Sequence, residues 1–350
     1  MDDHTRQLLI EAAILAPSAD NSQPWLYRWN DNALNLWIDE TRSGGFSDQR
    51  QVLSDLAIGA CLENIVIRAY SLGYNHQIEY LPDPDGSPLW AAKLSFSPAP
   101  APQEEALANV MPDRHADRSF PWKGPVSLTT KQNLREEIEK IPGVKLTWLD
   151  GTPHYKTALK IMWLAESLRF GCKGLHQELF SSIRFDVGNN ASCEEGLAPA
   201  TLVIETPLKP AFKTLRHWQV MRALNWIGVN YLIGFRSVIL PTLLSPALCL
   251  LSIEQIDRVS VIQAGRAMQR LWLKTTEQGF ALQPFAAAGI ISLGFIQLPV
   301  NFISVQHKIS HGMNAIAGAD RGILFFRLGI TSRPRTAIHS QRRATPTFIK

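Results

Sequence analysis

Residues 16–25 read Ala16-Pro17-Ser18-Ala19-Asp20-Asn21-Ser22-Gln23-Pro24-Trp25, the densest run in the chain of residues with special backbone or hydrogen-bonding demands. An amphipathic helix is predicted over residues 4–15. It should end near Ala16, because the residue before a proline disfavours helical dihedrals. The loop offers several uncharged donors and acceptors and one charge, Asp20. It therefore suits the edge of a planar polar heterocycle better than a metal or a phosphate. The alternative is an ordinary helix-to-strand connection, in which Pro, Ser, Asp and Asn are common.

The composition indicates a globular, core-forming protein. Of the 350 residues, 45% are hydrophobic and 19% are charged, and the formal net charge is +4. These values exclude a disordered chain and do not favour a nucleic-acid partner. The four cysteines form no Cys-x-x-Cys pair, so neither a metal site nor a disulfide framework is expected (Cys61, Cys172, Cys193, Cys249). The amino-terminal Met-Asp-Asp-His lacks the apolar core of a signal peptide, which predicts a cytoplasmic location.

Two long apolar helices divide the chain into similar halves. They are predicted over residues 52–72 and 262–279, each closing on a glycine. Strands flank both helices, and this arrangement hints at an internal duplication. The run Ser97–Pro102 is typical of a linker, and we place the boundary between the halves near residue 112. The other expected elements are strands at 25–29, 34–38, 76–81, 89–96, 144–149, 246–252 and 324–328, helices at 128–140 and 153–183, and a loop at 42–50.

Residues 209–243 form an unusual apolar and aromatic insertion. Three arginines interrupt it (Arg216, Arg222, Arg236). A membrane-spanning helix needs about 20 mostly uncharged residues, so no membrane span is expected. We favour a helical lid over a pocket. The alternative is a packing insertion that does not contact a substrate.

The second candidate site element is Arg114-His115-Ala116-Asp117-Arg118-Ser119-Phe120. Two arginines four residues apart can grip one dianionic phosphate with their forked guanidinium groups. The alternative is a solvated basic stretch without a ligand.

Both elements resemble motifs of the FMN-dependent nitroreductase superfamily. The opening stretch is similar to its Pro-Ser-x-x-Asn-x-Gln-Pro-Trp signature, which lies against the flavin ring across a dimer interface. The resemblance implies flavin contacts for Pro17, Ser18, Ala19 and Asn21. The second element resembles Arg-x-Ser-x-Arg-x-Phe, which binds the FMN phosphate and ribityl chain. That resemblance implies cofactor-binding roles for Arg114, His115 and Arg118, with Ala116 departing from the usual hydroxyl residue.

Two further segments match the family by position. Arg342 and Arg343 look like a basic element near the carboxyl terminus that returns to the same phosphate. The alternative is a basic, disordered tail. Ala286 and Ala287 follow the second long helix, where the family supplies backbone groups near the reactive flavin nitrogen. The rival interpretation of that segment is a simple helix-to-strand turn.

The order of the elements resembles the single-chain, pseudo-dimeric Acg-like branch, as do Gly265-Arg266-Ala267 and Arg327-Leu328-Gly329. The resemblance implies an α+β, nitroreductase-like fold with mixed sheets and long central helices, whose halves (1–112 and 113–350) form an intrachain pseudo-dimer. The flavin loop lies in the first half and the arginines in the second, so one site is complete. Because the dimer is built within one chain, we expect a monomer.

The function implied by this resemblance is ping-pong oxidoreduction of a flat aromatic or conjugated small molecule through FMN. The default is NAD(P)H-dependent reduction of nitroaromatics or quinones, in which the flavin carries the chemistry and no side chain is catalytic. One alternative is a biosynthetic dehydrogenase or oxidase of secondary metabolism, including antibiotic biosynthesis, that acts on a heterocycle or a bipyrrole alcohol. Another is a protein that holds FMN without turnover. A competing class is an anion-binding protein that uses the acid-free tail from Thr331, with strongly salt-dependent affinity.

Overall fold

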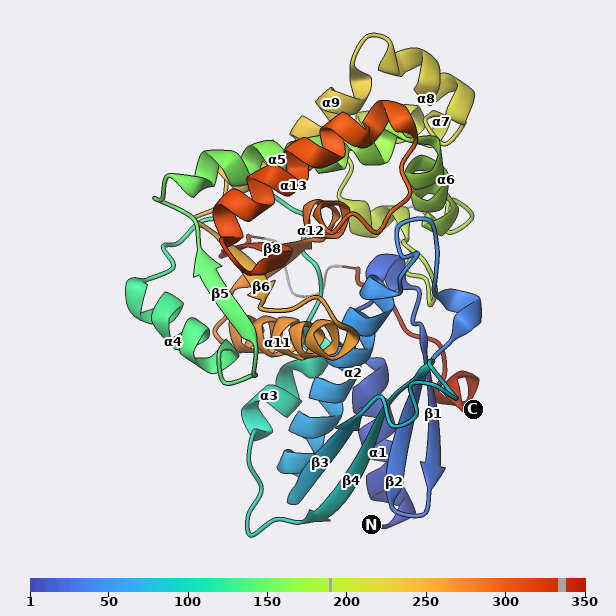
Figure 1. Cartoon of the computed structure of the whole chain (residues 1–350), viewed down its shortest axis with the longest axis vertical. Helices are drawn as coiled ribbons and strands as arrows, with labels where there is room; N and C mark the ends of the chain where they lie inside the picture. The colour runs from blue at the N-terminus through green and yellow to red at the C-terminus, as the bar shows by residue number, and fades with distance from the viewer. Residues whose placement is uncertain (189–190, 333–337) are drawn as a thin grey trace.

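The computed structural model describes residues 1–188, 191–332 and 338–350, and it has two four-stranded sheets (Figure 1). Their strand orders are β1-β2-β4-β3 and β5-β6-β8-β7, so the second sheet repeats the strand order of the first. The strands are β1 Trp25–Asn30, β2 Ala33–Ile38, β3 Tyr74–Tyr80, β4 Trp90–Pro98, β5 Val144–Trp148, β6 Ala247–Ile253, β7 Ala281–Phe285 and β8 Arg321–Gly329.

The α+β class and the two-half arrangement are confirmed. All strand pairs within the two sheets are antiparallel. Among the described residues, parallel pairing is limited to isolated bridges, such as Tyr27 with Ile349, so the prediction of mixed sheets is wrong. The first two residues of the predicted linker belong to β4, because Tyr74 and Asn75 of β3 pair with Pro98 and Ser97. In the sequence, the strands of one sheet precede residue 112 and those of the other follow it. The boundary between the halves stays a prediction.

Two long helices, α2 (Val52–Ser71) and α11 (Arg258–Glu277), cross at the centre of the molecule, between the sheets (Figure 1). Helix α2 is apolar on nearly every face and is buried along most of its length. The helices approach closely where each has a glycine. A Cβ atom at Gly59 would lie 2.0 Å from the carbonyl oxygen of Ile262, and one at Gly265 would lie 2.2 Å from that of Leu56. The absence of both side chains therefore permits the crossing.

We expect Gly59→Ala to destabilise the protein by about 1–3 kcal/mol, because an added methyl group would push two helix backbones apart. Gly188→Ala is the matched control, since its new Cβ would meet nothing nearer than 3.9 Å. Urea unfolding measures both free energies. Equal stability of the two variants would show that the helices do not cross as described.

Arginine side chains near this crossing form ion pairs with glutamates. The fully buried Glu63 accepts from Arg266 Nε at 2.9 Å and from Arg270 Nε at 2.6 Å. Burial alone would raise the pKa of Glu63, but the two guanidinium groups hold it below its ordinary value. Arg270 also pairs with Glu104 at 3.1 Å and with Glu137 at 2.7 Å. These arginines therefore have carboxylate partners within the protein.

The remaining helices cover the sheets and the ends of the crossing. They are α1 Asp3–Ile14, α3 Glu105–Val110, α4 Leu128–Ile138, α5 His154–Gly171, α6 Lys173–Ser182, α12 Ala287–Ser292 and α13 Ile303–Ala317. Helices α3, α12 and α13 were not predicted from the sequence. Helix α13 packs against α5, where Gly312 lies over Ile161, and its buried residues Ile309, Gly312, Met313 and Ile316 recur at helical spacing.

The insertion is helical, as predicted. It forms α7 (Lys209–Thr214), α8 (Trp218–Asn225), α9 (Val229–Gly234), a π-helical turn (Phe235–Ile239) and α10 (Leu240–Leu243). In the described parts of the chain, no helix by itself has the length and apolar character of a membrane span. The pair 218–225 and 229–243, bent by 95°, meets that standard when its members are taken together.

Candidate functional site

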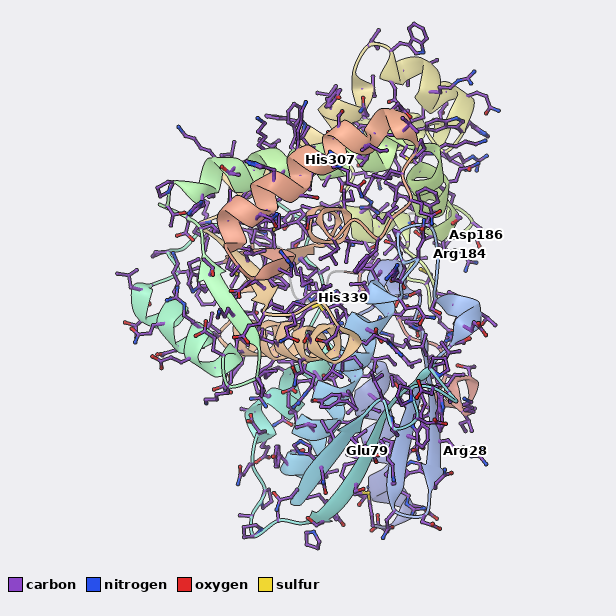
Figure 2. All side chains as sticks on the ribbon, in the orientation of Figure 1. Arg28, Glu79, Arg184, Asp186, His307 and His339 are labelled. Atoms are coloured by element: carbon purple, nitrogen blue, oxygen red, sulfur yellow. The ribbon has the colours of Figure 1, made fainter. Side chains whose placement is uncertain are left out.

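A cavity of about 1040 Å³ lies where the two halves and the insertion meet. Its walls come from segments far apart in the sequence, including the loop after α1, the first half of α2, residues 111–118, the start of α12 and the end of α11. Figure 2 labels His339, one of its lining residues, in this central region. The structure brings ten predicted site residues to the cavity: Pro17, Ser18, Ala19, Asn21, Arg114, His115, Arg118, Ala286, Ala287 and Arg342.

The loop after α1 has a strained and well-fixed backbone. Asp20, Asn21 and Gln23 have φ values of 48°, 58° and 54°, although none is a glycine. Such conformations cost free energy and tend to occur at functional sites. Ser18 helps to hold the turn, since its Oγ accepts from the Gln23 N–H at 2.9 Å. The loop therefore presents its backbone to the cavity in a fixed form.

The amide side chains of this loop tie distant segments together. Asn21 Nδ2 donates to the carbonyl oxygens of Glu194 at 3.1 Å and Gln341 at 3.2 Å. Gln23 Nε2 donates to the same Glu194 carbonyl at 2.6 Å. We expected polar side chains aimed at a heterocycle, whereas these two donors bind the protein's own backbone. Their first effect is to join the loop to residues 193–195 and to the tail.

Arg342 connects the tail to the opening loop. Its Nε and Nη2 donate to the Ala16 carbonyl at 3.1 and 2.9 Å, and its Nη1 donates to Asn21 Oδ1 at 2.9 Å. Burial lowers the pKa of Arg342 to about 10. The described part of the tail is thus ordered against the protein, and Phe348 is fully buried against Trp25. Arg333 and Arg335 lie outside the described residues.

Arg343 is the one predicted site residue that does not line the cavity. Its guanidinium group donates to the Gln23 carbonyl at 3.2 Å and lies 4.4 Å from the ring centre of Phe348. Its backbone N–H donates to Gln23 Oε1 at 3.0 Å. The structure therefore gives Arg343 contacts that hold the tail in place. Of the two tail arginines, Arg342 lines the cavity.

Arg114 is buried at the cavity and has no carboxylate partner among the residues that the structure describes. Its Nη2 donates to the Leu15 carbonyl at 3.3 Å, and its guanidinium lies 4.5 Å from the ring centre of Trp272. Its Nε is buried and makes no hydrogen bond among the described residues. Burial, and then the charge of Arg342, lower the pKa of Arg114 well below its ordinary value. The site therefore holds a cation in an unfavourable environment.

Arg118 completes a group of three cavity arginines. Its Nη1 donates to the Thr201 carbonyl at 3.2 Å, and burial lowers its pKa although the charge of Asp20 opposes this shift. Within the described ranges, Arg114, Arg118 and Arg342 form no ion pair with any carboxylate. The arginines at the helix crossing are all paired. An anion in the cavity would supply the missing charge.

A pair of histidines lies beside these arginines. The rings of His115 and His339 have their centres 3.9 Å apart. His115 Nδ1 lies 2.8 Å from the carbonyl oxygen of Asp113. Burial lowers the pKa of His115, so this ring is neutral in the protein at neutral pH.

The insertion forms an apolar wall of the cavity, as the lid hypothesis expects. One ion pair stands in this wall, Arg236 with Glu205 at 2.7 Å. Residues of α5 and α6 face it, and one of them, Arg169, pairs with Glu166 at 3.4 Å. Four further lining residues were not predicted from the sequence: Glu166, Arg169, Trp272 and Thr201. The insertion's lining residues are Ala211, Phe212, Leu215, Leu232, Ile233, Arg236, Ser237, Val238 and Pro241.

Comparisons with known proteins agree with the motif resemblance. No family model matches the chain. An uncharacterized protein of Mycobacterium tuberculosis, MT1398, is 23% identical over 346 residues, which are 97% of this chain and 47% of that protein. The putative NAD(P)H nitroreductase acg of the same species is 29% identical over 175 residues, or 49% of this chain and 51% of the relative. The chain spans about half the length of these curated relatives.

Among solved structures, the FMN-dependent nitroreductase NfnB from Mycobacterium smegmatis, in complex with NADPH, is 14% identical and has a TM-score of 0.37. The match covers 70% of this chain and 97% of NfnB. The putative NAD(P)H nitroreductase Rv3131 of M. tuberculosis is 30% identical over 120 residues, which are 33% of this chain and 34% of that protein. The resemblance to Acg-like nitroreductases is confirmed: over part of its length, the chain is similar to the putative NAD(P)H nitroreductases of M. tuberculosis.

Proposed function

We propose that the chain binds one FMN in the central cavity and acts as an FMN-dependent oxidoreductase. The observation that carries this proposal is the group of three cavity arginines, Arg114, Arg118 and Arg342, which have no carboxylate partner among the described residues. A phosphate would offset their charge and accept from the buried Nε of Arg114, which has no hydrogen-bond partner there. The residues present therefore fit the phosphate of a flavin mononucleotide.

The size and lining of the cavity fit a flavin together with a second flat molecule. Its volume of about 1040 Å³ is at the upper end of ordinary ligand sites, which reach roughly 1,000 Å³. The arginines lie toward the loop after α1, and the insertion supplies the apolar wall. This division supports a charged end for the phosphate and an apolar end for an aromatic or conjugated substrate, with the flavin ring between them.

The protein's own residues would bind the flavin, orient it and shield it from water. Bound FMN would supply hydride and electron transfer. The backbone of residues 17–21 and the main chain at Ala286 and Ala287 would lie along the ring, and the insertion would exclude water. Donor and acceptor would use the same apolar cleft in turn, a ping-pong scheme. The relative named a putative NAD(P)H nitroreductase supports NAD(P)H as the donor and a nitro compound as the acceptor.

Anaerobic mixing of the flavin-loaded protein with NADPH tests the direction of electron flow. We expect the visible absorbance of the flavin to bleach and then to return when a quinone or nitroaromatic is added. Bleaching by a heterocyclic alcohol, with no response to NADPH, would support the biosynthetic alternative instead. An unchanged spectrum with every donor would support a protein that holds FMN without turnover.

We also expect FMN binding to be coupled to the protonation of His115. Burial lowers the pKa of His115 below its ordinary value of 6.5, and a bound phosphate dianion would raise it again. The complex then binds a proton more tightly than the free protein does. FMN affinity, relative to that of a His115→Gln variant, should therefore rise as the pH falls through the raised pKa of His115 in the complex, and level off below its lowered pKa in the free protein. Fluorescence titrations at several pH values measure this, and parallel pH profiles of the two proteins would contradict it.

A further inference from the structure

The outer surface of the insertion exposes large apolar side chains at one end of the molecule. We call residues 216–235, which include α8 and α9, the lid tip. Trp226 and Ile227, at the junction of these helices, are 90% and 79% exposed. Gly228 has a φ of +79° and allows the sharp turn between the two helices. Figure 1 shows α8 and α9 at one end of the long axis of the molecule.

The surroundings of the lid tip are basic. The chain has no aspartate or glutamate from Thr206 to Ile253, and the insertion contains Lys209, Lys213, Arg216, Arg222 and Arg236. Arg236 is paired with Glu205, whereas Arg216 and Arg222 are exposed and make no ion pair among the described residues. The neighbouring α13 is also free of acids and has His307, labelled in Figure 2, and Lys308. An exposed apolar apex thus stands in a positively charged field.

This combination matches the physical chemistry of an anionic lipid surface. Tryptophan is favoured at the membrane–water interface, and basic side chains near it gain about 1 kcal/mol each from anionic lipids. A second copy of the chain fits less well. A two-fold contact through the lid tip would place its basic side chains against their own copies, with no acid on either side.

We infer that the lid tip docks on an anionic membrane surface. Trp226 and Ile227 enter the headgroup region, and Arg216 and Arg222 lie against the lipid phosphates. The helices stay at the interface and do not cross the bilayer, because the chain bends by 95° between them and they do not form one straight span. This docking needs no flavin, so it stands or falls independently of the proposed function.

Vesicle co-sedimentation of the full chain tests the proposal. We expect binding to vesicles of phosphatidylcholine with phosphatidylglycerol, little binding to phosphatidylcholine alone, and weaker binding at high salt. The double variant Trp226→Ser, Ile227→Ser should bind anionic vesicles at least about tenfold more weakly, because two apolar side chains no longer enter the interface. The double variant Arg216→Gln, Arg222→Gln should show a similar loss at low salt.

Two matched controls separate docking from general effects. Leu128→Ser removes an apolar side chain that is 83% exposed on α4, and Arg28→Gln removes an exposed arginine on β1, near the opposite end of the molecule (Figure 2). Both should bind vesicles as the wild type does. Absence of wild-type binding to anionic vesicles, or equal binding by all variants, would overturn the proposal. So would a concentration-dependent dimer, seen by ultracentrifugation, that the Trp226→Ser, Ile227→Ser variant no longer forms.

Discussion

Replacing Arg114 by methionine should weaken FMN binding by about 10²–10⁴-fold, because a guanidinium group makes two charge-assisted hydrogen bonds to a phosphate, each contributing about 1.5–3 kcal/mol. The same change should leave the flavin-free protein nearly as stable as the wild type, or more stable. Burial and Arg342 lower the pKa of Arg114 well below its ordinary value, which means that folding disfavours its charge. Methionine removes that buried charge and keeps apolar contact with Trp272.

FMN affinity and the stability of the flavin-free protein are both measured on the Arg114→Met variant. Fluorescence titration gives FMN affinity, and urea unfolding of the flavin-free protein gives stability. Arg28→Met is the control, since Arg28 is exposed on β1 and should change neither. If Arg114→Met destabilised the flavin-free protein by several kcal/mol, Arg114 would be a structural residue and the missing anion would not be needed to explain its burial.

Two adjacent arginines in the tail should differ sharply. Arg342→Met should lower FMN affinity by about 100-fold, because Arg342 lines the cavity and holds both the Ala16 carbonyl and the side chain of Asn21. Arg343→Met should leave FMN affinity within about threefold, because Arg343 contacts Gln23 and Phe348 instead. The Arg343→Met variant should instead lose about 1 kcal/mol of unfolding free energy.

The adjacent pair is informative because the two variants have the same composition and differ by one position. Flavin retained after gel filtration compares them directly, and thermal unfolding reports stability. Equal loss of flavin in both variants would mean that the tail acts as a single basic element. Loss in Arg343→Met alone would show that the tail reaches the phosphate by a different path from the one described.

The local elements of the fold could be predicted from the sequence. The apolar run of α2, the hairpin of β1 and β2, and the end of α1 before Pro17 all follow from short-range patterns. Helix α13 was missed although Ile309, Met313 and Ile316 recur at helical spacing. Strand β7 could not be predicted in this way, because it contains Pro284 within five residues and is decided by its pairing with β8.

The candidate site shows the same limit. The loop and the first arginine element could be found by their spacing, and the structure brings them to one cavity. The partners of Asn21 could not be found, because the Glu194 carbonyl lies 173 residues further along the chain. Nor could the sequence show which of Arg342 and Arg343 faces inward, since neighbouring residues of one type have the same pattern. Glu166 and Arg169 on α5 reach the cavity only through the packing of distant elements.

The central claim is a single complete flavin site in a chain with two similar halves. Titration of flavin-free protein with FMN, followed by absorbance and by removal of unbound flavin, counts the sites most directly. We predict saturation at one FMN per chain, with loss of binding in Arg114→Met. Saturation at two FMN per chain would contradict the single site, and a protein that cannot be loaded with FMN would contradict the assignment of the cavity to a flavin.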